Sequence, residues 1–141
     1  MLACNSAVVY ESYQHIPSAG WNKDSLVSFE VEIADTLSLH HISIDLRNTT
    51  EYPYCNLFLF VTSTAPSGQS LCDTIEYMLT DDNGRWLGQG FSTIIDSRLA
   101  YRQYVKFTQC GVFRFDIRQG MRKNVLPYIT DVGLRIEKET P

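Results

Sequence analysis

Several features that would assign a chemistry or a membrane span are missing from this sequence. No apolar stretch approaches the roughly 20 residues that a membrane-spanning helix needs. Neither a C-x-x-C pair nor the G-x-S-x-G motif of hydrolase nucleophiles occurs. Lysine and arginine form no basic run, and the formal net charge is −4, which argues against nucleic acid as a partner. No internal repeat or low-complexity segment is present.

The composition that remains is that of an ordinary globular protein. The chain has 141 residues, of which 44% are hydrophobic and 20% are charged. A chain of this length can bury a substantial core, and its composition is not that of a disordered segment. We expect one folded domain over residues 8–138, preceded by a tether over residues 1–7 and followed by a tail over residues 139–141.

Alternation of apolar and polar residues predicts most of the secondary structure. Residues 112–117 and 132–136 alternate regularly, with Phe113, Phe115 and Leu134 among those expected on the buried side. Period-2 alternation marks a strand with one buried face. The same reasoning predicts further strands over residues 26–33, 41–48, 73–79 and 104–107. Residues 56–62 are apolar on both faces, which suits a central strand, and the short apolar run 8–10 is interpreted as an edge strand or an arm.

Residues 91–103 have the least regular pattern. Ile94 and Ile95 fit a strand, whereas residues 96–101 are interpreted as one helical turn. About eight short strands separated by turn signals, with no convincing helix, are typical of an all-β protein. We therefore expect a two-sheet antiparallel sandwich, jelly-roll-like, over the domain predicted above.

The histidines and the acidic residues do not form a metal or catalytic motif. His40 and His41 are neighbours in a predicted strand, so their side chains point to opposite faces and cannot readily bind one ion. We expect both to be partly exposed. Residues 81–84 read Asp-Asp-Asn-Gly, which is typical of a hairpin turn. A calcium loop is the alternative, but the spacing lacks the complete acidic pattern and its distal glutamate, so no metal or other cofactor is expected.

Cysteine and tryptophan are expected mainly in the interior. Cys55, Cys72 and Cys110 stand at no metal-binding or redox spacing, and we expect them to be small buried hydrophobic residues. A single disulfide among them is the alternative in an oxidising compartment. Trp21 follows a glycine-containing loop, and we expect it to close one end of the sandwich rather than to stack on a sugar.

The N-terminus contains a pattern found at bacterial lipoprotein cleavage sites. Ala3 precedes Cys4, as a small residue precedes the acylated cysteine of such proteins. So short a pattern also arises by chance, and both interpretations stay open on these residues alone. No acidic run follows Cys4, which favours a periplasm-facing lipoprotein over a surface-exported one if the cysteine carries lipid.

Five short stretches spread over most of the chain carry a family resemblance. In order, they are Tyr52-Pro53-Tyr54 with Asn56-Leu57; Asp73-Thr74; Gly84-Arg85-Trp86-Leu87-Gly88 with Gly90; Gln119-Gly120-Met121-Arg122; and Ile129-Thr130-Asp131-Val132-Gly133-Leu134-Arg135-Ile136-Glu137. Together they resemble the GldH-type gliding-motility lipoproteins of the Bacteroidetes, in the family's order.

The resemblance implies a cellular setting rather than a reaction. It implies a lipid anchor on Cys4, the cell envelope, and a part in the gliding machinery or its linked protein secretion system. With lipid on Cys4, we expect an outer-membrane location facing the periplasm. The partners that it implies are other envelope proteins of that apparatus. It implies no enzymatic activity and no cofactor, and the sequence selects no catalytic residues.

The loop over residues 119–124 is the predicted partner-binding segment. It joins two regular strands, yet it places Met121 beside Arg122 and Lys123, which is not the composition of a minimal turn. Arginine suits bidentate contacts with anions, and methionine adapts to varied apolar surfaces. The alternative is that Met121 folds back onto the core while Arg122 pairs with a local acid such as Asp131.

We expect aromatic residues from two other segments to extend this binding surface. They are Tyr52 and Tyr54, in the bend around Pro53, and Trp86, after the acidic turn. A carbohydrate-binding module of the envelope is the second functional hypothesis, because jelly-roll sandwiches often bind glycans and eight tyrosines are available. An exposed, coplanar row of aromatics would favour a glycan, whereas buried tryptophans and tyrosines would favour a protein partner.

Overall fold

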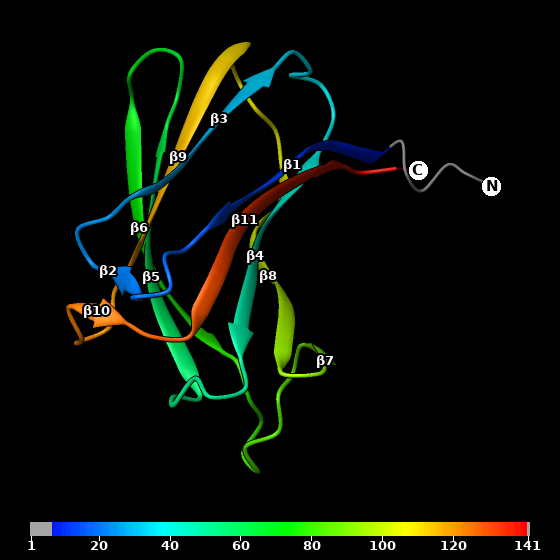
Figure 1. Ribbon diagram of the computed structural model, residues 1–141. Coiled ribbons are helices and arrows are strands. Elements are labelled where there is room, and N and C mark those ends of the chain that lie inside the picture. The colour runs from blue at the N-terminus through cyan, green and yellow to red at the C-terminus, as the bar shows by residue number, and fades with distance from the viewer. Residues whose placement is uncertain (1–6, 141) are drawn as a thin grey trace.

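The computed structural model describes residues 7–140, which form two antiparallel β-sheets packed face to face (Figure 1). The strands are β1 (Val8–His15), β2 (Trp21–Asn22), β3 (Val27–Ile33), β4 (His40–Thr49), β5 (Asn56–Thr64), β6 (Ser70–Met78), β7 (Gln89–Phe91), β8 (Ile94–Val105), β9 (Gly111–Gln119), β10 (Val125–Leu126) and β11 (Ile129–Lys138). Within residues 7–140, no helix is long and apolar enough to cross a membrane.

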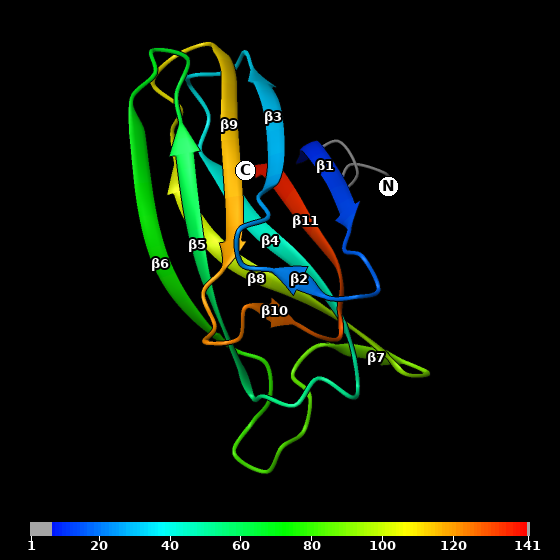
Figure 2. The same ribbon diagram turned by 60° about the vertical axis from the view of Figure 1, so that its left-hand side comes forward.

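The strand order is that of a jelly roll. One sheet has the order β1-β11-β4-β8-β7 and the other has the order β3-β9-β5-β6, while β2 and β10 form a small pair. Figure 2 shows the four-stranded sheet in front, with β6 at its outer edge. Among the eight long strands, every connection except the β5–β6 hairpin crosses from one sheet to the other. The predicted all-β, jelly-roll-like sandwich is confirmed.

The core lies between the sheets and is built from the alternating residues of the long strands. Phe113 and Phe115, on β9 of the four-stranded sheet, and Leu134, on β11 of the five-stranded sheet, are buried between the sheets, as their spacing predicted. The predicted inner faces of residues 26–33 and 41–48 are buried as well. Burial of these side chains is the main force that holds the two sheets together.

Trp21 closes one end of the sandwich, as predicted. Its side chain is only 1% exposed, and its indole N–H donates to the carbonyl of Ser25 at 3.1 Å. Trp21 pairs with Leu126 across the β2–β10 ladder. Gly20 precedes it with φ +115°, and a Cβ there would meet Val125 and the carbonyl of Leu126 within 3 Å, so a glycine is required.

The helical turn predicted over residues 96–101 is wrong. These residues lie within β8, which runs without a break from Ile94 to Val105 and pairs with both β4 and β7. Ser97 interrupts the apolar face of this strand, and Asp96 and Arg98 point outward into ion pairs. The sequence pattern is therefore weak even though the strand is long.

The predicted exposure of one histidine and of three cysteines is also corrected. His40 is buried rather than partly exposed, because its ring packs edge-on against Phe107 and its Nδ1 lies 3.0 Å from the carbonyl of Ser38. Cys55, Cys72 and Cys110 are exposed free thiols rather than buried residues, and among residues 7–140 no disulfide joins them. Cys72 is exposed because it lies on the outer face of an edge strand, and Cys55 and Cys110 because they lie in connecting segments.

The turn predicted over residues 81–84 is confirmed. The Gly84 amide donates to the carbonyl of Asp81 at 3.0 Å, and a single bridge between Thr80 and Trp86 follows. The Asp81 carboxylate accepts from the amides of Asn83 and Arg85, each at 2.9 Å. Backbone donors thus occupy one oxygen of the carboxylate that the calcium alternative would have used.

Candidate functional site

A groove of about 490 Å³ opens between the bend after β4 and the loop that joins β9 to β10. Its lining residues are Tyr54, Phe58, Gly120, Met121, Arg122 and Lys123. Three of them carry apolar or aromatic side chains and two carry cations. The structure therefore brings together Tyr54, Met121, Arg122 and Lys123, which were predicted as site residues from two distant segments of the sequence.

Met121 forms a wall of this groove while resting on the core. Its side chain is partly buried against core residues, and its Sδ lies 3.3 Å from the backbone amide of Phe58. Met121 therefore folds back onto the core, as the alternative interpretation predicted. The pairing of Arg122 with Asp131 that went with that alternative is not seen. Asp131 Oδ1 lies 3.1 Å from His15 Nδ1, and within residues 7–140 no ion pair joins Asp131 to Arg122.

Gln119 holds the loop in shape from beneath. This side chain is 2% exposed, and its Nε2 donates to the carbonyl of Lys123 at 2.8 Å and to that of Trp21 at 3.3 Å. Its Oε1 accepts from the amide of Met121 at 2.8 Å. One amide side chain therefore satisfies backbone groups at both ends of the loop, which fixes the positions of Met121 and Lys123.

The glycine at the start of the loop allows two phenylalanine side chains, Phe58 and Phe60, to pack against the loop backbone and form the aromatic floor of the groove. A Cβ on Gly120 would lie 3.0 Å from the ring of Phe60 and 3.3 Å from the Cβ of Phe58. Both rings belong to the outer face of β5, where the sequence showed apolar residues on both faces. Phe58 and Phe60 were not predicted as site residues, and the two-sided apolar pattern is the signal that could have identified them.

Tyr52 supports the groove but does not line it. The side chain is buried, and its hydroxyl donates to the carbonyl of Asn56 at 2.8 Å. Its ring meets that of Tyr54 edge-on, with 5.6 Å between the centroids. Burial raises the pKa of the Tyr52 phenol well above its usual value. Trp86 is half-buried next to the 81–84 turn and is not among the lining residues.

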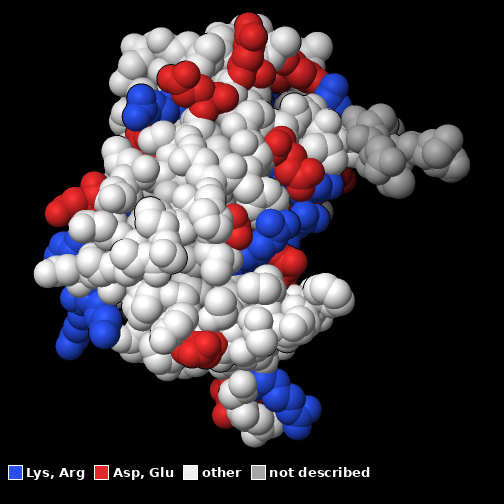
Figure 3. Space-filling view, viewed as in Figure 1, with Lys and Arg blue, Asp and Glu red and all other residues white. Residues whose placement is uncertain are grey.

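Two cations line the groove, and a third lies near its aromatic floor. Arg122 and Lys123 are exposed, and the guanidinium of Arg118 lies 5.3 Å from the centroid of Phe60. None of the ion pairs within residues 7–140 involves these three side chains. Figure 3 shows basic atoms gathered at the lower left, beside β10. An apolar groove with a basic rim suits an apolar side chain flanked by carboxylates.

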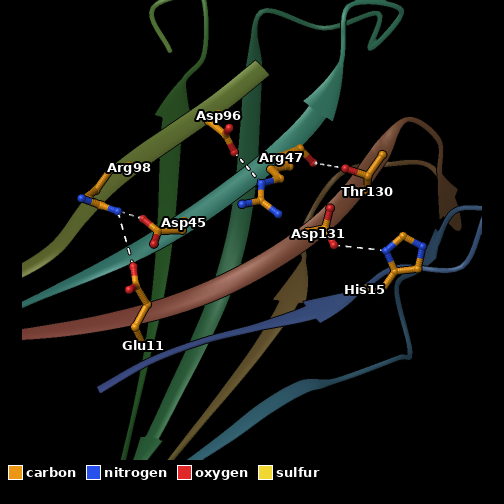
Figure 4. Close-up of polar contacts among 8 residues, drawn as sticks. All are labelled: Glu11, His15, Asp45, Arg47, Asp96, Arg98, Thr130 and Asp131. Atoms are coloured by element: carbon orange, nitrogen blue, oxygen red, sulfur yellow. Dashed lines mark hydrogen bonds and ion pairs between the residues drawn. The ribbon is translucent and has the colours of Figure 1, made fainter. Parts of the chain in front are cut away.

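A second surface, on the outer face of the five-stranded sheet, is polar and internally paired. His15, Asp131, Arg47 and Asp96 form one row across β1, β11, β4 and β8 (Figure 4). Arg47 Nε lies 2.7 Å from Asp96, and His15 Nδ1 lies 3.1 Å from Asp131. Opposite charges on neighbouring strands stabilise one register over the others.

The next row of this polar face contains a buried acid. Arg98 Nε lies 2.9 Å from the carboxylate of Asp45, a residue that is 2% exposed. Arg98 Nη2 lies 3.6 Å from the carboxylate of Glu11 (Figure 4). Glu11 also pairs with Arg135 at 2.8 Å. Glu11, Asp45 and Arg98 are among the residues that line a groove of about 570 Å³. Because the charges on this face are already paired within the sheet, we interpret the face as structural. Asp131 and Arg135, two charged residues of the 129–137 stretch, take part in these pairs.

Comparisons with known proteins agree with the sequence resemblance. The model of the family described as GldH lipoprotein matches residues 8–136. The protein named gliding motility lipoprotein GldH homolog, from Christiangramia forsetii, is 42% identical over 143 residues, which cover 96% of this chain and 87% of that protein. The protein named gliding motility lipoprotein GldH, from Flavobacterium johnsoniae, is 36% identical over 146 residues, covering 99% of this chain and 90% of that one.

Solved structures offer a much weaker likeness. A chain in the structure of infectious bursal disease virus, Gt strain, shares 11% sequence identity and a TM-score of 0.38 with this one. The alignment covers 92% of this chain and 31% of that chain. No statement about function follows from a likeness of this degree.

Proposed function

This chain belongs to the GldH lipoprotein family, and from that premise we propose that it is a non-enzymatic envelope protein that docks a partner of the gliding or linked secretion apparatus. The relatives from Christiangramia forsetii and Flavobacterium johnsoniae are both named for gliding motility, and both are called lipoproteins. In this proposal the domain over residues 8–138 is the interaction module, and the chain needs no cofactor.

The groove at the β9–β10 loop is the observation that carries this proposal. Its apolar lining and basic rim fit a segment that presents an apolar side chain between carboxylates. Its lining residues include no carboxylate, histidine, serine or cysteine, so the groove holds none of the nucleophile–base or paired-carboxylate arrangements built from those residues. Binding is therefore the function that this groove supports best.

Cys4 is the proposed lipid attachment site and lies outside the described residues. Four residues of fully extended chain reach at most about 14 Å, so a lipid there would hold the start of β1 near the membrane. Figure 1 shows the start of β1 and the end of β11 on the right, and β10 at the lower left. An anchor at Cys4 would thus leave the groove facing away from an outer membrane, towards the periplasm.

Burial of the aromatic residues favours a protein partner over a glycan. Trp21 and Tyr52 are buried, and Trp86 is half-buried. Tyr104 and Tyr128 are the exposed tyrosines of residues 7–140, and both have positive φ. Tyr104 lies on β8 and Tyr128 in the connection between β10 and β11, so they do not form a row on one sheet. The arrangement that would have supported a sugar platform is absent from residues 7–140.

The test is site-specific photo-cross-linking in cells of the native host. A photoreactive residue at Lys123 should give adducts with envelope proteins, whereas the same residue at Asp82, in the exposed 81–84 turn, should not. The double variant Arg122→Glu/Lys123→Glu, with the photoreactive group moved to Tyr54, should reduce the adduct. Equal adducts at positions 123 and 82, or none at 123, would contradict docking at the groove.

A further inference from the structure

Each sheet of the sandwich ends in two edge strands, and the four edges differ in how they are protected. The edges are β1 and β7 in one sheet and β3 and β6 in the other. An edge strand presents backbone N–H and C=O groups that can pair with another chain. Proteins commonly prevent this with short strands, bulges, prolines, lysines or covering segments.

Three of the four edges carry such protection. β7 is only three residues long, and β1 has a register irregularity between Val8 and Tyr10. On β3, the carbonyl of Ser28 accepts from the side-chain amide of Gln14 in β1, so the neighbouring sheet occupies part of that edge. Pairing with a further strand would be limited at each of these places.

β6 carries none of those devices. It has nine residues, each paired with β5 in a continuous register from Asn56–Met78 to Thr64–Ser70. Its sequence, SLCDTIEYM, contains no proline, lysine or arginine. Leu71 is 62% exposed and Met78 is 50% exposed, so apolar side chains are open to solvent at both ends of the strand. No strand of residues 7–140 pairs with its outer edge.

One charge on β6 points towards the other sheet, and it is already paired. The Asp73 carboxylate accepts from the Tyr101 hydroxyl and from Arg102 Nη2, both at 2.6 Å. An unpaired inward charge would oppose a neighbouring strand, but a neutralised one does not. The hydroxyl of Tyr77 also donates to the carbonyl of Ala100 at 2.8 Å. These links fix β6 to β8, so its free edge is a rigid template.

We propose that β6 receives an extended segment of a partner protein as a fifth strand of the four-stranded sheet. Backbone pairing would supply the affinity, and side chains at alternate positions would supply the specificity. Glu76 and Met78 share the outer face, two residues apart, so the segment carries a cation beside Glu76 and an apolar residue beside Met78. β6 itself has no cation, so a second copy of this strand lacks that residue.

The exposed thiols provide a test that does not need the partner's identity. In native membranes, alkylation of Cys72 on β6 should be about tenfold slower than in the purified chain, because a partner at about ten times its dissociation constant leaves roughly a tenth of the edges free. Cys110, which lies outside the strands, is the internal control and should react equally in both. Cys72 reacting equally in both would overturn the proposal.

Two further measurements separate this arrangement from others. Glu76→Lys should restore the reactivity of Cys72 in membranes, whereas Glu32→Lys, an exposed position on β3 at the opposite edge, should leave it protected. Amide hydrogen exchange over residues 70–78 should be slowed in the isolated complex. Protected Cys72 with unslowed amides would mean side-chain contact only, and concentration-dependent protection in the purified chain would mean a second copy; either result overturns the proposal.

Discussion

The ring of Tyr13 on β1 lies directly over Gly133 of β11, its cross-strand neighbour. A Cβ at position 133 would come within 2.8 Å of the Tyr13 Cδ1 atom and 2.9 Å of the Ser12 carbonyl oxygen. The guanidinium of Arg47 lies on the same ring, 4.3 Å from its centroid. The first and last long strands are thus joined by an aromatic ring that fits only against a glycine.

Gly133→Ala should therefore lower the stability of the chain. The added methyl group meets both a ring and a backbone oxygen, so the strands must shift, and we expect a loss of about 1–3 kcal/mol in the free energy of unfolding. Chemical denaturation measures it. Gly90→Ala is the control, because a Cβ there meets only the flexible end of Ile95 at 3.3 Å. Equal stability of the two variants would show that Tyr13 can move aside.

Gln119→Ala should destabilise the chain and loosen the groove. The substitution removes the partner of the Met121 amide and of the Lys123 carbonyl, and we expect a loss of about 1–3 kcal/mol. Hydrogen exchange should show faster exchange at the amide of Met121. Gln103→Ala, at an exposed position of β8, should leave stability unchanged. A Gln119→Ala chain as stable as the parent would remove Gln119 as the support of the loop.

Asp73 should make stability fall in acid. Hydrogen bonds from Tyr101 and Arg102 hold the pKa of the Asp73 carboxyl below its usual value. A carboxyl whose pKa is lower in the folded state stabilises the fold above its unfolded pKa, near 3.9, and loses that contribution as the pH falls through its folded pKa. Asp73→Asn should thus be less stable than the parent at pH 7, with the difference shrinking below about pH 4.

The control for this pH dependence is Asp82→Asn, in the exposed 81–84 turn. Its unfolding free energy should follow that of the parent at every pH. Thermal melts between pH 2 and pH 7 compare the three chains. A constant difference between Asp73→Asn and the parent across that range would mean that the carboxylate's charge does not contribute.

Lipidation should depend on Cys4 alone. Each methylene buried in a membrane contributes about 0.8 kcal/mol, so two or three acyl chains anchor a protein stably where one does not. Cells of the native host fed a clickable fatty acid should label the parent chain and the Cys72→Ser variant. Cys4→Ser should take up no label and leave the membrane fraction. Incorporation of label into the Cys4→Ser variant would contradict the assignment of Cys4 as the lipid attachment site.

Strands with a regular apolar face were predictable from the sequence, and the strands that lack one were not. The alternating spacing of Phe113, Phe115 and Leu134 was enough to predict the strands that contain them. β8 was misread because Ser97 stands on its inner face while its outer face is occupied by ion pairs made with distant strands. Strand register and cross-strand pairing depend on tertiary contacts, so the local spacing of residues does not predict them.

The candidate site was predictable in part for a related reason. Met121, Arg122 and Lys123 were found because their composition is unusual for a turn, and Tyr54 because it belongs to an aromatic bend. Phe58 was not singled out, and Gln119 was named only as the first residue of the loop, since an apolar residue in a central strand and a glutamine at a strand end are both commonplace. Their roles arise from the loop that folds over them.

The pairing of β1 with β11 also sets the order in which the molecule can be completed. Val8 lies opposite Glu137, so the two ends of the chain are neighbours in the finished sheet. A chain that emerges amino end first holds β1 without β11, the one strand of residues 7–140 that pairs with it, until nearly every other residue has appeared. Pairing between such distant residues requires closing a very long loop, which makes folding slow. During that interval the unpaired strand is a place where a chaperone could act and where aggregation could begin.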